Sequence, residues 1–74
     1  MELHEAEALW LEYQPVPGVL FRLNDPVEIS GGEHAGEMGS TVALLALIPE
    51  PRYLVELEPG GEDIEVSQSQ LSTV

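Results

Sequence analysis

The apolar residues at the start of the chain recur with the spacing of one helix face. Within residues 2–13 this face consists of Leu3, Ala6, Trp10 and Tyr13. Two prolines and a glycine follow in residues 14–18, where they cannot continue a helix. The pattern therefore predicts a short N-terminal helix in residues 1–14 and a linker over residues 15–18.

From Val19 onward the apolar spacing changes to a period of two, which is typical of strands. The strands expected from this pattern cover residues 19–23, 27–29, 41–48, 52–58 and 63–66. A glycine-rich loop over residues 30–39 and a Pro-Gly-Gly turn over residues 59–62 join them.

A chain of 74 residues is long enough for one domain. We therefore predict a single, mainly β domain: a short N-terminal α-helix, then a small antiparallel barrel of about five strands over residues 19–71. Leu71 would anchor its end, and residues 72–74 would form a frayed tail.

The expected strand 41–48 is apolar on both of its faces. Residues assigned to the barrel interior are Val42, Leu44, Ala46 and Ile48, and those on the outer face are Ala43, Leu45 and Leu47. A strand with two apolar faces is expected to be buried on both. The N-terminal helix, through Leu3, Trp10 and Tyr13, is one expected cover for the outer face. A second copy of the chain is the other.

The segment from Val27 to Val42 carries glycines at four places in and beside the loop. These are Gly31, Gly32, Gly36 and Gly39, expected to supply tight backbone turns. The segment resembles a KOW motif, which joins two strands of an SH3-like barrel. The resemblance covers residues 24–71 and implies a following hairpin, a short helical turn over residues 68–71 and a minimal last strand. It also implies an RNA or ribosome contact, although KOW loops with that role are basic and this loop carries no Lys or Arg.

The charge balance bears on the choice of partner. Fourteen acidic residues face only Arg22 and Arg52, which gives a formal net charge of −12. A nucleic-acid binder uses Lys and Arg to replace phosphate counterions, so this composition argues against nucleic acid. It also argues against anionic membrane surfaces. High charge by itself keeps a small domain soluble; the sharper interpretation is a partner with a basic surface.

Other candidate chemistry is sparse. His4-Glu5 begins like a zinc-binding HExxH helix, but Ala8 occupies the second ligand position. Glu33, His34 and Glu37 are a conceivable metal cluster that is more typical of a solvated loop. We therefore expect no catalytic residues, no metal and no cofactor. The absence of cysteines, of a signal peptide and of a membrane-length apolar segment favours the cytoplasm.

The leading functional hypothesis is a non-catalytic protein-protein interaction module on an SH3-like barrel. Its candidate surfaces are the loop 30–39, the hairpin 56–65, an aromatic near the loop and the outer apolar patch. The residues expected on these surfaces are Phe21, Glu33, His34, Glu37, Leu45, Leu47, Glu56, Glu58, Glu62 and Asp63. Trp10 and Tyr53 are expected in the core instead. The alternatives are an acidic inhibitor or immunity-type protein that blocks a basic nucleic-acid-processing enzyme, and the RNA- or ribosome-associated role that the KOW resemblance implies.

Overall fold

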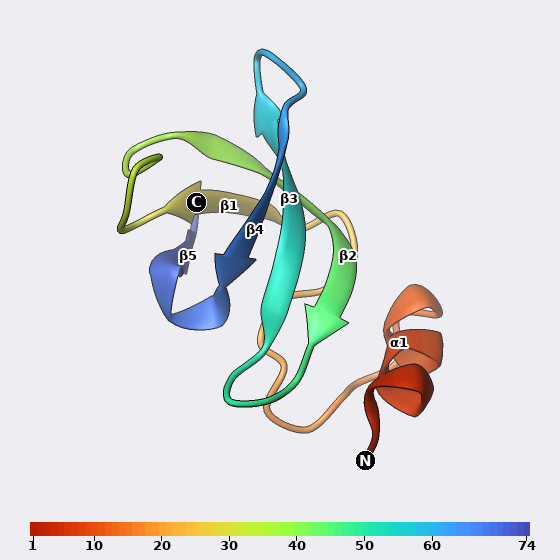
Figure 1. Cartoon of the computed structure of the whole chain (residues 1–74). Coiled ribbons are helices and arrows are strands. Elements are labelled where there is room, and N and C mark those ends of the chain that lie inside the picture. The colour runs from red at the N-terminus through yellow and green to blue at the C-terminus, as the bar shows by residue number, and fades with distance from the viewer.

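The chain folds as one antiparallel sheet with a helix packed beside it (Figure 1), and the computed structural model describes all 74 residues. Its elements are α1 (Leu3–Leu11), β1 (Pro26–Ile29), β2 (Met38–Ala46), β3 (Arg52–Glu58), β4 (Asp63–Ser67), the 3-10 turn η1 (Gln68–Gln70) and β5 (Leu71–Thr73). The strand order is β4-β3-β2-β1-β5. The mainly β fold with a short N-terminal helix is confirmed. Hydrogen bonds do not close the sheet into a barrel, because β4 and β5 remain its two edges.

The hairpin of β3 and β4 follows the predicted alternation. Tyr53, Val55 and Leu57 on β3 are buried, as is Val66 on β4. The turn between the strands is held by the amide of Leu57, which donates to the carbonyl of Glu62 at 2.7 Å. Strict alternation and a local turn are enough to set this register.

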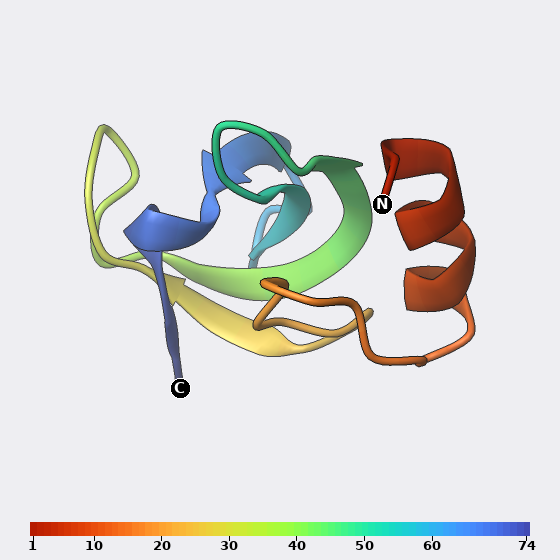
Figure 2. The same cartoon turned by 90° about the horizontal axis from the view of Figure 1, so that it is seen from below.

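Strand β2 departs from the predicted alternation. Its pairing with β3 shifts between Thr41 and Ala43 and again between Leu44 and Ala46. Such bulges change which residues face the core and bend the strand, as Figure 2 shows for the strongly curved β2. The strand therefore buries Thr41 and Leu44, two residues of opposite phase. The prediction that Val42, Ala46 and Ile48 share the inner face with Leu44 is wrong: Val42 and Ala46 are half-buried, and Ile48 lies beyond the strand and is 85% exposed.

The predicted strand over residues 19–23 is also wrong, because this segment runs into a turn that docks on β2. Asn24 donates its amide to the carbonyl of Thr41 at 2.7 Å, and Thr41 donates its own to the carbonyl of Asp25 at 3.1 Å. The Thr41 side chain, fully buried, accepts from the amide of Asp25 and donates to the carbonyl of Arg22. Asn24 takes a φ of +65°, which asparagine tolerates better than most residues.

Helix α1 packs on β2 of its own chain, through a narrower face than predicted. Ala6 and Trp10 are buried, whereas Leu3 and Tyr13 are 38% and 50% exposed. The indole Nε1 of Trp10 donates to the carbonyl of Phe21 at 2.7 Å, which fixes the helix to the segment that follows it. A seam with a second copy stays a prediction. No helix of this protein has the length and apolar character that crossing a membrane requires.

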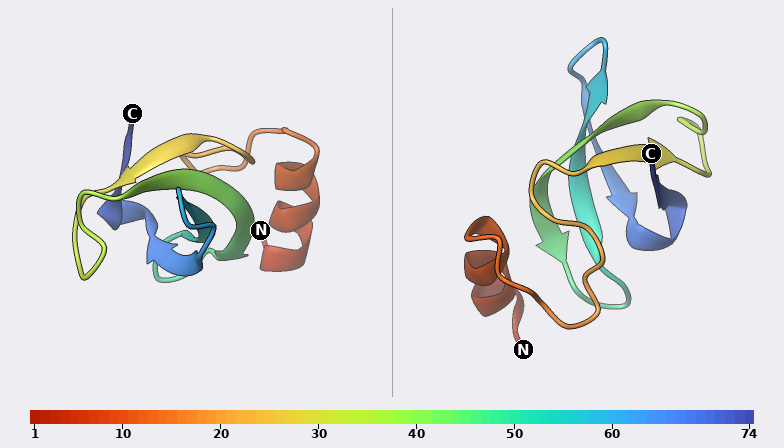
Figure 3. Two further views of the ribbon diagram at one scale, coloured as in Figure 1. Left: turned by 90° about the horizontal axis from the view of Figure 1, so that it is seen from above. Right: turned by 180° about the vertical axis from the view of Figure 1, so that it is seen from behind.

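The C-terminal residues form a strand where the sequence predicted a frayed tail. Val27, Glu28 and Ile29 of β1 pair with residues 71–73 of β5, and Leu71 is buried as expected. Ahead of β5, the Gln68 side chain accepts from the amide of Leu20 at 2.9 Å and from the hydroxyl of Tyr53. The bond from Tyr53 ties η1 to β3, and the bond from Leu20 ties it to the segment between α1 and β1, which crosses one face of the sheet (Figure 3).

Candidate functional site: an acidic groove beside β4

A groove of about 210 Å³ separates the β1–β2 loop from the edge strand β4. It is lined by Ile29, Gly31, Gly32, Glu33, His34, Ile64, Glu65, Val66 and Gln70. In Figure 1 the loop (yellow-green) lies to the left of β4. The floor includes buried apolar side chains, whereas the rim carries carboxylates, so we refer to it as the acidic groove.

The loop over residues 30–37 is closed by two backbone hydrogen bonds at its base. The amide of Ile29 donates to the carbonyl of Glu37, and the amide of Gly36 donates to the carbonyl of Ile29, both at 2.8 Å. Gly32 and Gly36 have φ values of +84° and +91°, as the prediction of tight glycine turns requires.

Gly39 serves a different purpose from the loop glycines, and its assignment to the loop is wrong. It lies within β2, opposite Leu57 of β3. A Cβ atom at this position would lie 2.3 Å from the carbonyl oxygen of Glu56. Close approach of β3, rather than a positive φ, is therefore what demands glycine here.

His34 and Glu37 form an ion pair on the loop, with Nδ1 of the histidine 2.9 Å from Oε2 of the glutamate. This hydrogen bond raises the pKa of His34 above its ordinary value, and desolvation opposes it. The charges of Glu37, Glu62 and Glu33 raise the same pKa further. Glu62 belongs to the β3–β4 turn and does not line the groove.

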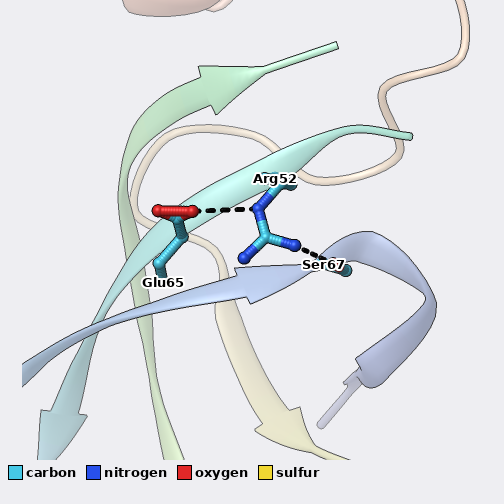
Figure 4. A network of polar contacts seen from close by, with 3 residues as sticks. All are labelled: Arg52, Glu65 and Ser67. Atoms are coloured by element: carbon cyan, nitrogen blue, oxygen red, sulfur yellow. Dashed lines mark hydrogen bonds and ion pairs between the residues drawn. The ribbon is translucent and has the colours of Figure 1, made fainter. Parts of the chain in front are cut away.

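On the β4 side, the rim contains an ion pair that crosses from β3. Nε of Arg52 lies 2.9 Å from Oε1 of Glu65, and its guanidinium also donates to the hydroxyl of Ser67 (Figure 4). Sequence reasoning missed Glu65 as a site residue, although its place between Ile64 and Val66 on an alternating strand signals an exposed side chain.

The remaining hairpin carboxylates extend the negative surface away from the groove. Glu56, Glu58, Glu62 and Asp63 are all exposed. Glu56 lies directly opposite Asp63 in the β3–β4 register, and Glu58 lies opposite Met38 of β2. Only Glu37 and Glu65 of the fourteen acidic side chains form ion pairs, so most of this charge has no cation beside it.

The three apolar candidates lie outside the acidic groove. Phe21 is 6% exposed and meets the ring of Tyr53 edge-on, with centroids 5.7 Å apart. The expectation that Phe21 is an exposed binding aromatic is therefore wrong, whereas Trp10 and Tyr53 lie in the core as expected. Leu45 is 36% exposed on β2, and Leu47 is half-buried against the core.

The chain has no metal-binding cluster, and its second depression lies beside α1. Glu33 does not join His34 and Glu37 in a metal-binding group, and nowhere in the chain do three or more His, Asp or Glu side chains gather in this way. A second depression of about 250 Å³ lies between α1 and the segment that follows it. Its walls include Trp10 and Phe21, which are already packed in the core.

Comparison with known proteins gives no relative for this chain: no protein-family model, curated protein or solved structure matches it significantly.

Proposed function

We propose that this protein is a non-catalytic interaction module whose acidic groove binds a basic segment of a partner protein. We further propose that its sheet is an open barrel of the SH3-like class. The strand order β4-β3-β2-β1-β5 and the 3-10 turn before β5 support that class. The β1–β2 loop, on whose glycines the KOW resemblance rests, joins two paired antiparallel strands and supports the same class.

The observation that carries the functional proposal is the meeting of two acidic segments at one groove. Glu33 comes from the β1–β2 loop, whereas Glu65 comes from the edge strand β4, and both line the groove. Carboxylates that converge on a concave surface raise the local concentration of cations. Solubility alone requires surface charge, but it does not require carboxylates from two segments to gather at one groove.

The energetic signature of such a site is electrostatic steering. Unpaired surface charges speed the encounter with an oppositely charged partner and select against the wrong one, while apolar contacts supply affinity. Ile64, half-buried, and the buried Val66 at the floor are the available apolar contacts. We therefore expect an association that weakens with ionic strength, because salt shortens the Debye length to about 8 Å at 0.15 M.

A matched pair of charge variants tests the proposal. The groove variant carries Glu33→Gln and Glu65→Gln, and the control carries Glu5→Gln and Glu12→Gln on or beside α1, so both lose the same charge. The probe is a short fluorescent peptide that alternates Lys and Val, titrated by anisotropy at two ionic strengths. The groove variant should bind about twofold to thirtyfold more weakly than the control, on the basis of about 0.2–1 kcal/mol for each of the two exposed charge contacts.

Two results would contradict the proposal. Equal affinity of the two variants for the peptide would show that only net charge matters. Retention of a single-stranded RNA at low salt, in place of the peptide, would favour the RNA contact that the KOW resemblance implies.

The exposed hairpin supports a second candidate, an acidic inhibitor of a basic nucleic-acid enzyme. Glu56, Glu58 and Asp63 continue the acidic surface beyond the groove. If this surface enters a basic cleft, the intact protein should inhibit a member of a panel of purified nucleases. Charge reversal at these three residues and Glu62 should abolish that inhibition. Inhibition that persists after the reversal would contradict this second proposal.

A further inference from the structure

The free edge of β4 presents backbone groups that no part of the chain satisfies. At the two ends of the hairpin ladder, Leu57 donates to the carbonyl of Glu62 and Gln68 donates to the carbonyl of Pro51. Bonded and non-bonded pairs alternate along an antiparallel ladder, so Ile64 and Val66 point their backbone groups toward β3. The N–H and C=O groups of the alternate residues therefore point outward. These residues are Asp63, Glu65 and Ser67, and they make no backbone hydrogen bond outside the ladder.

This edge borders the acidic groove. Ile64, Glu65 and Val66 line one side of the groove, and the β1–β2 loop forms the other. A strand placed beside β4 would therefore lie in a space that the fold already leaves open. Its inward side chains would face Ile64 and Val66, and its outward side chains would lie beside Asp63 and Glu65, because side chains alternate along a strand.

The charge on the β4 edge determines which kind of segment can pair with it. Exposed edge strands invite pairing with other chains, and like charges oppose that pairing. Two β4 edges from two copies of this chain would bring Asp63 and Glu65 of the two copies close together. Arg52 pairs with Glu65, but Asp63 has no cation beside it, so like charges disfavour a homodimer at this edge. A segment with Lys or Arg at alternate positions would instead place its cations beside these carboxylates.

We propose that β4 accepts an extended segment of a partner protein as an added strand, with basic side chains on its outer face and apolar side chains over Ile64 and Val66. This inference rests on the proposed function, since it names how the basic segment binds. Main-chain hydrogen bonds to Asp63, Glu65 and Ser67 would supply affinity, and the alternating side chains would supply specificity.

Backbone methylation of the probe tests the pairing directly. The probe is the alternating Lys–Val peptide, prepared in two forms that are N-methylated at every second residue in opposite phases. A strand paired with β4 turns only one set of its amides toward the protein. One methylated form should therefore lose at least tenfold in affinity while the other binds like the parent peptide. Equal binding by all three forms would overturn strand addition but leave the acidic groove as a binding site.

A matched pair of protein variants tests the same contact from the other side. Ser67 has a φ of −73°, which proline accepts, and its N–H faces away from β3. Ser67→Pro removes that N–H, whereas Ser67→Ala keeps it and removes the same hydroxyl. The proline variant should bind about threefold to tenfold more weakly than the alanine variant, and equal affinities would contradict the pairing.

Hydrogen exchange in the complex separates the two levels of the proposal. The amides of Asp63 and Glu65 should gain protection when the peptide is bound, whereas those of Ile64 and Val66 are bonded to β3 throughout. Binding without this gain refutes strand addition. Absence of carboxylate-dependent binding by any form of the peptide refutes the proposed function itself.

Discussion

Glu56 on β3 and Asp63 on β4 lie directly opposite each other in the antiparallel register, with no cation paired to either. Side chains at such positions are about 5 Å apart at Cβ, and like charges there are destabilising. The protein therefore carries a local electrostatic cost on the hairpin that borders its acidic groove.

Reversing one of these charges should stabilise the fold and weaken recognition. We expect Glu56→Lys to raise the free energy of unfolding by about 0.2–1 kcal/mol, because an attractive cross-strand pair replaces a repulsive one. Urea denaturation measures this change, with Glu12→Lys beside α1 as the control for net charge. A fall in stability below that control would contradict the repulsion between Glu56 and Asp63.

The close approach of β3 to β2 makes Gly39 irreplaceable. Gly39→Ala should destabilise the protein by about 1–3 kcal/mol, since its Cβ would overlap the carbonyl oxygen of Glu56 and force the strands apart. Gly60→Ala is the matched control, because a Cβ at position 60 meets nothing within 4 Å. Similar midpoints of chemical denaturation for the two variants would show that β2 and β3 can move apart to admit the Cβ without loss of stability.

The hydrogen bond from Trp10 to the carbonyl of Phe21 holds α1 against the sheet. Trp10→Phe keeps much of the apolar ring but leaves a buried carbonyl without its donor, at a cost of about 1–3 kcal/mol. Leu11→Ala, at a position 52% exposed, should change stability much less. An equal effect of both substitutions on thermal unfolding would argue against this bond as the anchor of the helix.

The pairing of His34 with Glu37 predicts that one contribution to the stability of the fold is lost as the pH rises. The hydrogen bond to Glu37 raises the pKa of His34 in the folded state, so the protonated histidine favours folding. The stabilisation by protonated His34 is complete below about pH 6.5, which is the pKa of histidine in the unfolded chain. It is lost as the pH rises through the higher pKa of His34 in the folded protein. Glu37→Gln should lower the pKa of His34 in an NMR titration, whereas Glu12→Gln should leave it unchanged. A His34 pKa that is the same in all three proteins would contradict the pairing.

The burial of Tyr53 predicts a loss of stability at high pH. Desolvation raises the pKa of its phenol, and the charge of Asp25 adds to this effect, although nearby backbone groups oppose it. The unfolded chain therefore releases this proton first, so stability should fall once the pH exceeds about 10, the unfolded pKa. Tyr53→Phe should flatten this decline in alkaline denaturation experiments, and an unchanged decline would assign it to other groups.

The parts of the fold that follow from the sequence are those fixed by local interactions. The β3–β4 hairpin has uninterrupted alternation and a turn of its own, so its register does not depend on distant residues. The helix follows from its periodic face, and Trp10 and Tyr53 follow from their place in apolar patterns. The acidic loop and the acidic hairpin are likewise evident as separate surfaces.

The other features of the fold depend on tertiary structure, because they arise where segments distant in the sequence meet. Bulges in β2 turn both Thr41 and Leu44 inward, and the buried Thr41 then converts an apparent strand at residues 19–23 into a docked turn. Phe21 becomes core because it lies against Tyr53, and the chain end becomes β5 because β1 has a free edge. In the strand order β2 and β3 separate β1 from β4, so the acidic groove exists only because the curved sheet brings the β1–β2 loop near β4. Composition determines the negative charge of the protein, whereas long-range packing determines that Glu33 and Glu65 line the same groove.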